Sequence, residues 1–249
     1  MVKYKKVPTV KKFIWLSLAG GIVFWNTLAS ADNKQPSAHL KNKFDFYILA
    51  TQWIPGWCAV GTGKSGADLD ETHACQQQVN QPLMYHGLWP ENNNGTYPAD
   101  CSVVPELDTT KLSFHNPFDS YLSNSASFLN HEWSKHGTCS NYYYAGQESS
   151  NQQEYYQQVN DYFTKSISLY KNINLATFSF KLSAESIQQQ IHRLNPQIPV
   201  KSILVMCDKD QDSQFLTGLW FCVNKSNDKF IHCPAALLKT SCNGTLLTR

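Results

Sequence analysis

The chain has 249 residues, of which 42% are apolar and 13% aromatic, and its 21 Lys and Arg nearly balance 19 Asp and Glu. This composition excludes an intrinsically disordered or collagen-like chain, and the length is sufficient for one domain with a sizeable core. The formal net charge of +2 is not spread evenly, because five of the lysines lie within the first 12 residues.

The N-terminal segment has the pattern of a secretory signal peptide. A lysine-rich start precedes an apolar run over 13–29, and Ala29-Ser30-Ala31 has the small residues typical of a cleavage site. The alternative is a membrane anchor, since the run is near the length that spans a bilayer, but the small residues and the polar sequence after them favour cleavage. We therefore expect a signal peptide over 1–31, a mature domain over 32–249, secretion or export to the periplasm, and no membrane attachment after cleavage.

Removal of the signal peptide reverses the sign of the net charge. Residues 1–31 contain five of the 21 basic residues and none of the 19 acidic ones, so 16 basic residues remain and the net charge becomes −3. All eight cysteines lie in the mature part, and an even number behind a signal peptide predicts disulfides. Many pairings of eight cysteines are possible, and the sequence alone does not choose among them.

The hydrophobic pattern of the mature chain predicts strands and helices in no strict alternation, which favours an α+β fold. We expect one disulfide-stapled domain, in which a mainly antiparallel central sheet packs against several α-helices. Ser183 is a plausible N-cap of one helix. In chain order, we expect a strand over 44–53, helices over 120–138, 152–171 and 184–194, and strands over 200–206, 215–223 and 229–233.

The densest group of chemically active side chains is the segment 131–136, HEWSKH. At about 100° per helical residue, His131, Glu132, Lys135 and His136 share one face of a helix, while Trp133 points toward the core. Two imidazoles beside a carboxylate and an ammonium group suit acid–base chemistry on an anion.

A zinc site is the alternative interpretation of this segment. The spacing H-E-x-x-x-H places the histidines about 140° apart on a helix, whereas H-E-x-x-H places them about 40° apart. Lys135, between them, would also repel a cation. We therefore expect neither a metal nor a cofactor.

A second segment, 85–90, contains His86. A single histidine is weak evidence, because it is often a structural residue in a buried turn. An acid–base reaction, however, needs a proton-transfer group on each side of the reacting centre, and histidine can serve on both sides near neutral pH. His86 is therefore the candidate partner of the histidines in 131–136.

Together these segments resemble the ribonuclease T2 family. HGLWP at 86–90 and HEWSKHGTC at 131–139 are similar to its two active-site segments, and FDFYILATQW at 44–53 resembles its first core strand. The spacing of the last four cysteines is similar too, so the resemblance covers nearly all of the mature chain. It implies a secreted, monomeric, metal-independent endoribonuclease of low base specificity. Single-stranded RNA would be cleaved through a 2′,3′-cyclic phosphate, and DNA, which lacks the 2′-hydroxyl, would not be a substrate.

The resemblance also implies a role for each side chain of the two segments. By motif position, His136 is the general base, His86 the general acid and His131 a phosphate ligand. Glu132 and Lys135 would stabilise the pentacoordinate phosphorane. A non-catalytic binding protein on the same scaffold is the alternative, although such a protein would be expected to lose a histidine.

Base recognition is implied less directly. Trp89, Tyr97 and Phe128 fall where family members place aromatic residues that stack on bases, and Gln52 would face the base pocket; for each aromatic residue the alternative is core packing. Glu91 stands where some members carry an Asp that binds a base edge.

The likeness further implies three disulfides and leaves a fourth pair. In chain order these are Cys58–Cys75, Cys101–Cys139, Cys207–Cys242 and Cys222–Cys233, of which the first is the remaining pair.

Overall fold

The structure is a computed structural model that describes residues 42–60, 75, 82–119, 122, 124–144, 151–175 and 178–248. The chain groups into two compact units, Met1–Gln35 and Pro36–Arg249, and the described residues all belong to the second. The predicted signal peptide lies outside the described residues. Within the ranges above, no helix is both long enough and apolar enough to cross a membrane.

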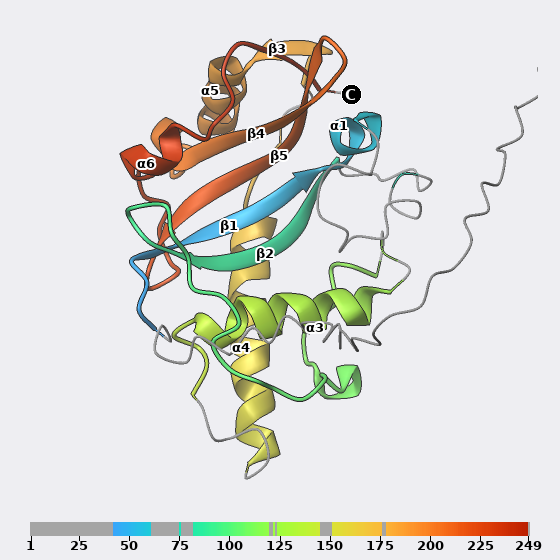
Figure 1. The fold of residues 1–249 in the computed structure, drawn as a ribbon, viewed down its shortest axis with the longest axis vertical. Helices are drawn as coiled ribbons and strands as arrows, with labels where there is room; N and C mark the ends of the chain where they lie inside the picture. Colours follow the sequence, from blue (N-terminus) through green and yellow to red (C-terminus); the bar gives the residue numbers. More distant parts are fainter. Residues whose placement is uncertain are drawn as a thin grey trace, which may run out of the picture. The chain divides into compact units, whose positions relative to one another are not determined.

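A six-stranded sheet forms the centre of the fold (Figure 1). Its strands follow the order β2-β1-β5-β6-β3, and β4 pairs with β5. The pairings are antiparallel except for a short parallel contact between β5 and β6. The α+β prediction is therefore confirmed. The strands are β1 (Phe46–Trp53), β2 (Leu83–Glu91), β3 (Lys181–Ser183), β4 (Ile203–Asp210), β5 (Ser213–Asn224) and β6 (Thr245–Leu247).

Helices pack around this sheet. In Figure 1, α3 lies beside the edge strand β2, and α4, which contacts β2, passes behind the sheet. Ser183 caps α5 as predicted, since its hydroxyl accepts a hydrogen bond from the Ser186 N–H at 3.1 Å. The α-helices of the described residues are α1 (Ile54–Ala59), α3 (Ser125–Lys135), α4 (Gln152–Lys171), α5 (Ala184–Leu194) and α6 (Ala235–Leu238).

The helix predicted over 120–138 is shorter in the structure, and part of 120–123 lies outside the described residues. Asn124 caps α3, because its side chain accepts a hydrogen bond from the Ser127 N–H. After Lys135 the backbone continues as a 3₁₀ turn, Gly137–Cys139. A Cβ atom at Gly137 would lie 2.2 Å from the Trp133 ring, so glycine allows the chain to turn closely over the indole. His136 therefore ends the helix instead of lying within it.

Two strand predictions also differ from the structure. Val200–Ser202 forms a 3₁₀ turn, so the strand expected from 200 begins at Ile203. The region 229–233 contributes only an isolated bridge between Phe230 and Val223. Conversely, β2 was not predicted, because its Gly and Pro interrupt the usual strand pattern. It is an edge strand of the sheet, a position in which Pro90 is tolerated.

Both faces of the sheet are apolar. On one face, Leu49 of β1 belongs to a large cluster with Trp133 of α3 and Phe163 of α4. On the other face, Ile48 joins a smaller cluster that includes Leu237 of α6. Burial on both faces fixes the register of β1, and with it the neighbouring strand β2.

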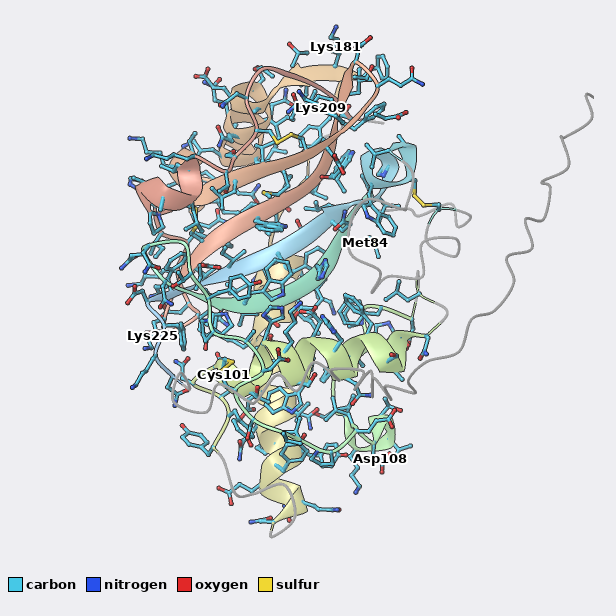
Figure 2. The ribbon with its side chains drawn as sticks, in the orientation of Figure 1. Met84, Cys101, Asp108, Lys181, Lys209 and Lys225 are labelled. Atoms are coloured by element: carbon cyan, nitrogen blue, oxygen red, sulfur yellow. A yellow bond between two sulfur atoms is a disulfide. The ribbon has the colours of Figure 1, made fainter. Side chains whose placement is uncertain are left out.

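Four disulfides form, and they confirm the three pairs that the family resemblance implies and the pair that remained: Cys101–Cys139, Cys207–Cys242, Cys222–Cys233 and Cys58–Cys75. Figure 2 shows Cys101 beside one end of α3, where it is bonded to Cys139. This bond ties the segment that follows β2 to the turn that follows α3.

We predict that replacing Cys101 and Cys139 together by Ala lowers the free energy of unfolding by about 2–5 kcal/mol, because the open chain gains conformational entropy when unfolded. Guanidinium unfolding measures the loss. The Cys58→Ala, Cys75→Ala double variant is the matched control. Its sequence separation is 17 residues against 38, so its loss should be smaller. A larger loss in the control would contradict this prediction.

Candidate active site

His86 occupies a β-bulge in β2. Tyr85 and Gly87 pair with consecutive residues of β1, so His86 is the extra residue between them. As a result Tyr85 and Leu88, three positions apart, both enter the large core cluster. The bulge thus removes His86 from the regular alternation of the strand, and its side chain, 20% exposed, meets α3.

The helix α3 and its C-cap carry the other catalytic candidates at different depths. Glu132 is fully buried and His136 is 5% exposed, whereas His131 and Lys135 are half-buried. Trp133 is fully buried, as predicted, and its indole N–H donates to the Tyr155 hydroxyl. The shared helical face therefore has a buried part and a part open to solvent.

The carboxylate of Glu132 joins α3 to β2. Its Oε1 lies 3.5 Å from Nε2 of His86. Its Oε2 accepts a hydrogen bond of 2.9 Å from the indole N–H of Trp89. Both contacts reach residues of the HGLWP segment, so the two segments form one site.

Aromatic rings hold the three imidazoles in place. Trp89 stacks on His136 with ring centroids 5.0 Å apart and meets the ring of His86 edge-on, also at 5.0 Å. Phe128 meets His86 edge-on at 5.2 Å and stacks over His131 at 6.2 Å. Two of the predicted base-stacking residues therefore pack directly against the catalytic candidates.

The electrostatic environment separates the ionisation of Glu132 from that of His136. Burial by itself would raise the pKa of Glu132, but the close approach and charge of His86, the charge of His136 and the Trp89 N–H hold it below its usual value. Burial lowers the pKa of His136 to about 3, against the opposing attraction of Glu132. At neutral pH the site thus contains an ionised carboxylate and a neutral His136.

The other predicted substrate residues lie in different surroundings. Phe128 is only 3% exposed and contributes to the core, so little of its ring is available to a base. Tyr97, after β2, is 56% exposed. Gln52 lies on β1, where its amide donates to the Thr217 carbonyl at 2.8 Å.

Sequence reasoning did not identify two features of this site. A Cβ atom at Gly87 would lie 1.9 Å from Oε2 of Glu132, so this glycine makes room for the carboxylate. Trp220 of β5 meets Trp89 edge-on at 4.9 Å and extends the aromatic cluster across the sheet. The glycine of the HGLWP pattern indicates the first feature, whereas the contact between Trp220 and Trp89 depends on the order of the strands. In the described part of the chain, no three His, Cys, Asp or Glu residues are grouped to hold a metal ion.

A buried carboxylate that faces one histidine, beside a second histidine held neutral, is an arrangement that can exchange protons with a bound substrate. The comparison with known families identifies the group: the model of the ribonuclease T2 family matches residues 44–233, and the chain belongs to that family.

Similar proteins agree with this membership. Ribonuclease DdI of Dictyostelium discoideum is 27% identical over 82% of this chain and 83% of its own length. Intracellular ribonuclease LX of Solanum lycopersicum is 30% identical over 77% of this chain and 78% of its own. Among solved structures, RNase NT in complex with 5′-AMP has a TM-score of 0.59 at 22% identity, covering 82% of this chain and 97% of that one. RNase MC1 from the seeds of bitter gourd has 0.57 at 21% identity, covering 82% and 100%.

Glu91, at the end of β2, should make the folding stability depend on pH. Burial raises its pKa to about 7 from 4.5, although the backbone N–H of Asn92 lowers it. Between these two pH values the unfolded carboxyl ionises and the folded one does not, so folding stability falls as pH rises. Glu91→Gln cannot ionise and should remove this loss: relative to the wild type, its melting temperature should increase from pH 4.5 to pH 7.

Thermal unfolding across pH 4–8 measures this difference. Glu185→Gln, in the exposed first turn of α5, is the matched control and should follow the wild type at every pH. If the curves of Glu91→Gln and the wild type run parallel, the prediction is wrong.

Proposed function

We propose that this protein is a secreted, metal-independent endoribonuclease that cleaves single-stranded RNA by transphosphorylation. The observation that best supports the proposal is the arrangement of His86 and His136 around one indole: the ring of Trp89 contacts both imidazoles. An internal transphosphorylation needs two proton-transfer groups of this kind. Secretion is proposed from the signal-peptide pattern over 1–31 alone.

The reaction begins at the substrate's own 2′-hydroxyl. Neutral His136 takes the proton of this hydroxyl as its oxygen attacks the adjacent phosphorus. The bond from phosphorus to the 5′-oxygen then breaks, and His86 donates a proton to that oxygen. The products are a 2′,3′-cyclic phosphate and a free 5′-hydroxyl. DNA lacks the nucleophile and is not cleaved.

Positive charge for the phosphate comes from the half-buried side chains of the site. Lys135 and, when protonated, His131 lie on α3 near His136, and their charges lower the pKa of that histidine. The same charges would stabilise negative charge that develops on the non-bridging oxygens. With a net charge of −3 for the mature sequence, we propose weak capture of long RNA and low base specificity, with stacking on exposed aromatic rings such as Tyr97.

Incubation of the mature protein with a short mixed-sequence RNA in EDTA should yield fragments that end in a 2′,3′-cyclic phosphate. His86→Ala and His136→Ala should each lower kcat by about 100-fold or more, because each removes a proton-transfer group. His115→Ala, an exposed histidine outside both segments, is the control and should retain full activity. Circular dichroism checks the fold of each variant. Absence of cleavage by the wild type, or cleavage of DNA, would refute the proposal.

The pH dependence follows from the two protonation states that the mechanism needs. Since the pKa of His136 is about 3, the base stays unprotonated through the acidic range. A histidine acid works only while protonated, and an unperturbed imidazole loses its proton at about pH 6.5. We therefore expect kcat/KM to reach its maximum on the acidic side of neutrality. A profile that still rises from pH 7 to pH 8 would contradict this assignment of acid and base.

A further inference from the structure

We propose that Glu132 acts through His86, as the anionic partner that holds the proton on the general acid, instead of contacting the phosphate. This inference rests on the proposed function. It differs from the phosphorane-stabilising role that the family resemblance implies for Glu132, and it follows from the depth and the contacts of the carboxylate.

The two carboxylate oxygens of Glu132 make different contacts. Oε2 is held by the indole N–H of Trp89 at 2.9 Å, which fixes the orientation of the group. Oε1 is buried, accepts no hydrogen bond from the described residues and lies 3.5 Å from Nε2 of His86. A small movement of a protonated imidazole would close this distance to a charge-assisted hydrogen bond. One oxygen is thus anchored and the other is reserved for His86.

The approach of Glu132 to His86 depends on steric access beside β2. Glu132 can reach this position only because the residue after His86 has no side chain, since a Cβ atom at Gly87 would lie 1.9 Å from Oε2 and 2.7 Å from the Trp89 indole nitrogen. The β-bulge that re-directs His86 and the glycine that admits Glu132 are therefore adjacent in the same strand. Both features serve the contact between imidazole and carboxylate.

The charge of Glu132 also suits an imidazole better than a phosphorane. The pKa of Glu132 is held below its usual value, so the group is ionised, and an ionised carboxylate beside a phosphorane would repel its negative charge. Beside an imidazole within about 4–6 Å, the same carboxylate favours the protonated form. The other titratable groups that interact with this cluster are of two kinds. Burial keeps the phenols of the large core, Tyr85 and Tyr162, neutral. The basic side chains of α3 and its C-cap are His131, Lys135 and His136.

The geometry also assigns the two ring nitrogens of His86. Nε2 faces Glu132, so Nδ1 is left to exchange a proton with the 5′-oxygen. The arrangement resembles the carboxylate–histidine pair of a hydrolase triad, in which the carboxylate orients the imidazole and stabilises its protonated form. In this site the imidazole that is oriented and stabilised is the proposed general acid.

The test is the pH–rate profile of Glu132→Gln, which keeps the size of the side chain and removes its charge. The alkaline limb of kcat/KM should move to lower pH by about one unit, with a loss of about tenfold at pH 7. Toward the acidic end of the profile, activity should approach that of the wild type. Loss of Glu132 also lowers the proton affinity of His136, so the acidic limb should move in the same direction.

Two tryptophan variants serve as matched comparisons. Trp89→Phe removes the N–H that anchors Oε2 and should shift the alkaline limb in the same direction by a smaller amount. Trp133→Phe removes an indole hydrogen bond of the same length, to Tyr155, and should lower the melting temperature without moving the limb.

The possible outcomes separate this inference from the proposed function. Wild-type protein that does not cleave RNA would refute the function itself. If the wild type is active and Glu132→Gln loses the same factor at every pH, Glu132 acts on the transition state and our inference is wrong. An unshifted alkaline limb in a folded Glu132→Gln variant would also overturn it.

Discussion

The active site depends on the burial of one carboxylate between a strand and a helix. Glu132 is fully buried, and its contacts with His86 and Trp89 form a polar link between α3 and the edge strand β2. An ionised group at that depth is costly unless opposite charge and hydrogen bonds compensate it. The compensation comes from the side chains to which we assign the chemistry, so the relative position of β2 and α3 and the proposed reactivity of the site have a single cause.

Burial also affects the ionisation of His136, the proposed general base. His136 ends α3 under the ring of Trp89, where low exposure disfavours the imidazolium form. The same desolvated cluster therefore contains an ionised carboxylate and a neutral His136, together with His86, to which we assign the role of acid. Acid and base are distinguished by their neighbours, since both side chains are chemically the same. In the proposed mechanism, this local control allows a mature sequence with a net charge of −3 to act on a polyanion.

The sequence predicted the members of this site better than their arrangement. His86, Glu132 and His136 follow from motif and helical spacing, and the α+β class follows from hydrophobic pattern. A helical wheel, however, reports angles and not depth, so it could not distinguish buried Glu132 from half-buried Lys135. The bulge at His86 is a property of the register between two strands, and register depends on long-range pairing that local pattern does not contain. Local pattern also could not predict the burial of Phe128, which was expected to stack on a base, because residues distant in sequence bury its ring.

The glycine of HGLWP shows how a local residue choice connects these levels. In an antiparallel edge strand, glycine lowers strand propensity and contributes no side chain to the core. At Gly87 this deficit is what allows a carboxylate from α3 to approach the backbone of β2. The Cys101–Cys139 bond joins the segments that follow these two elements, and it limits how far they can separate. The fold thus gives up strand stability at one position and gains a fixed distance between helix and strand, which a two-histidine mechanism requires.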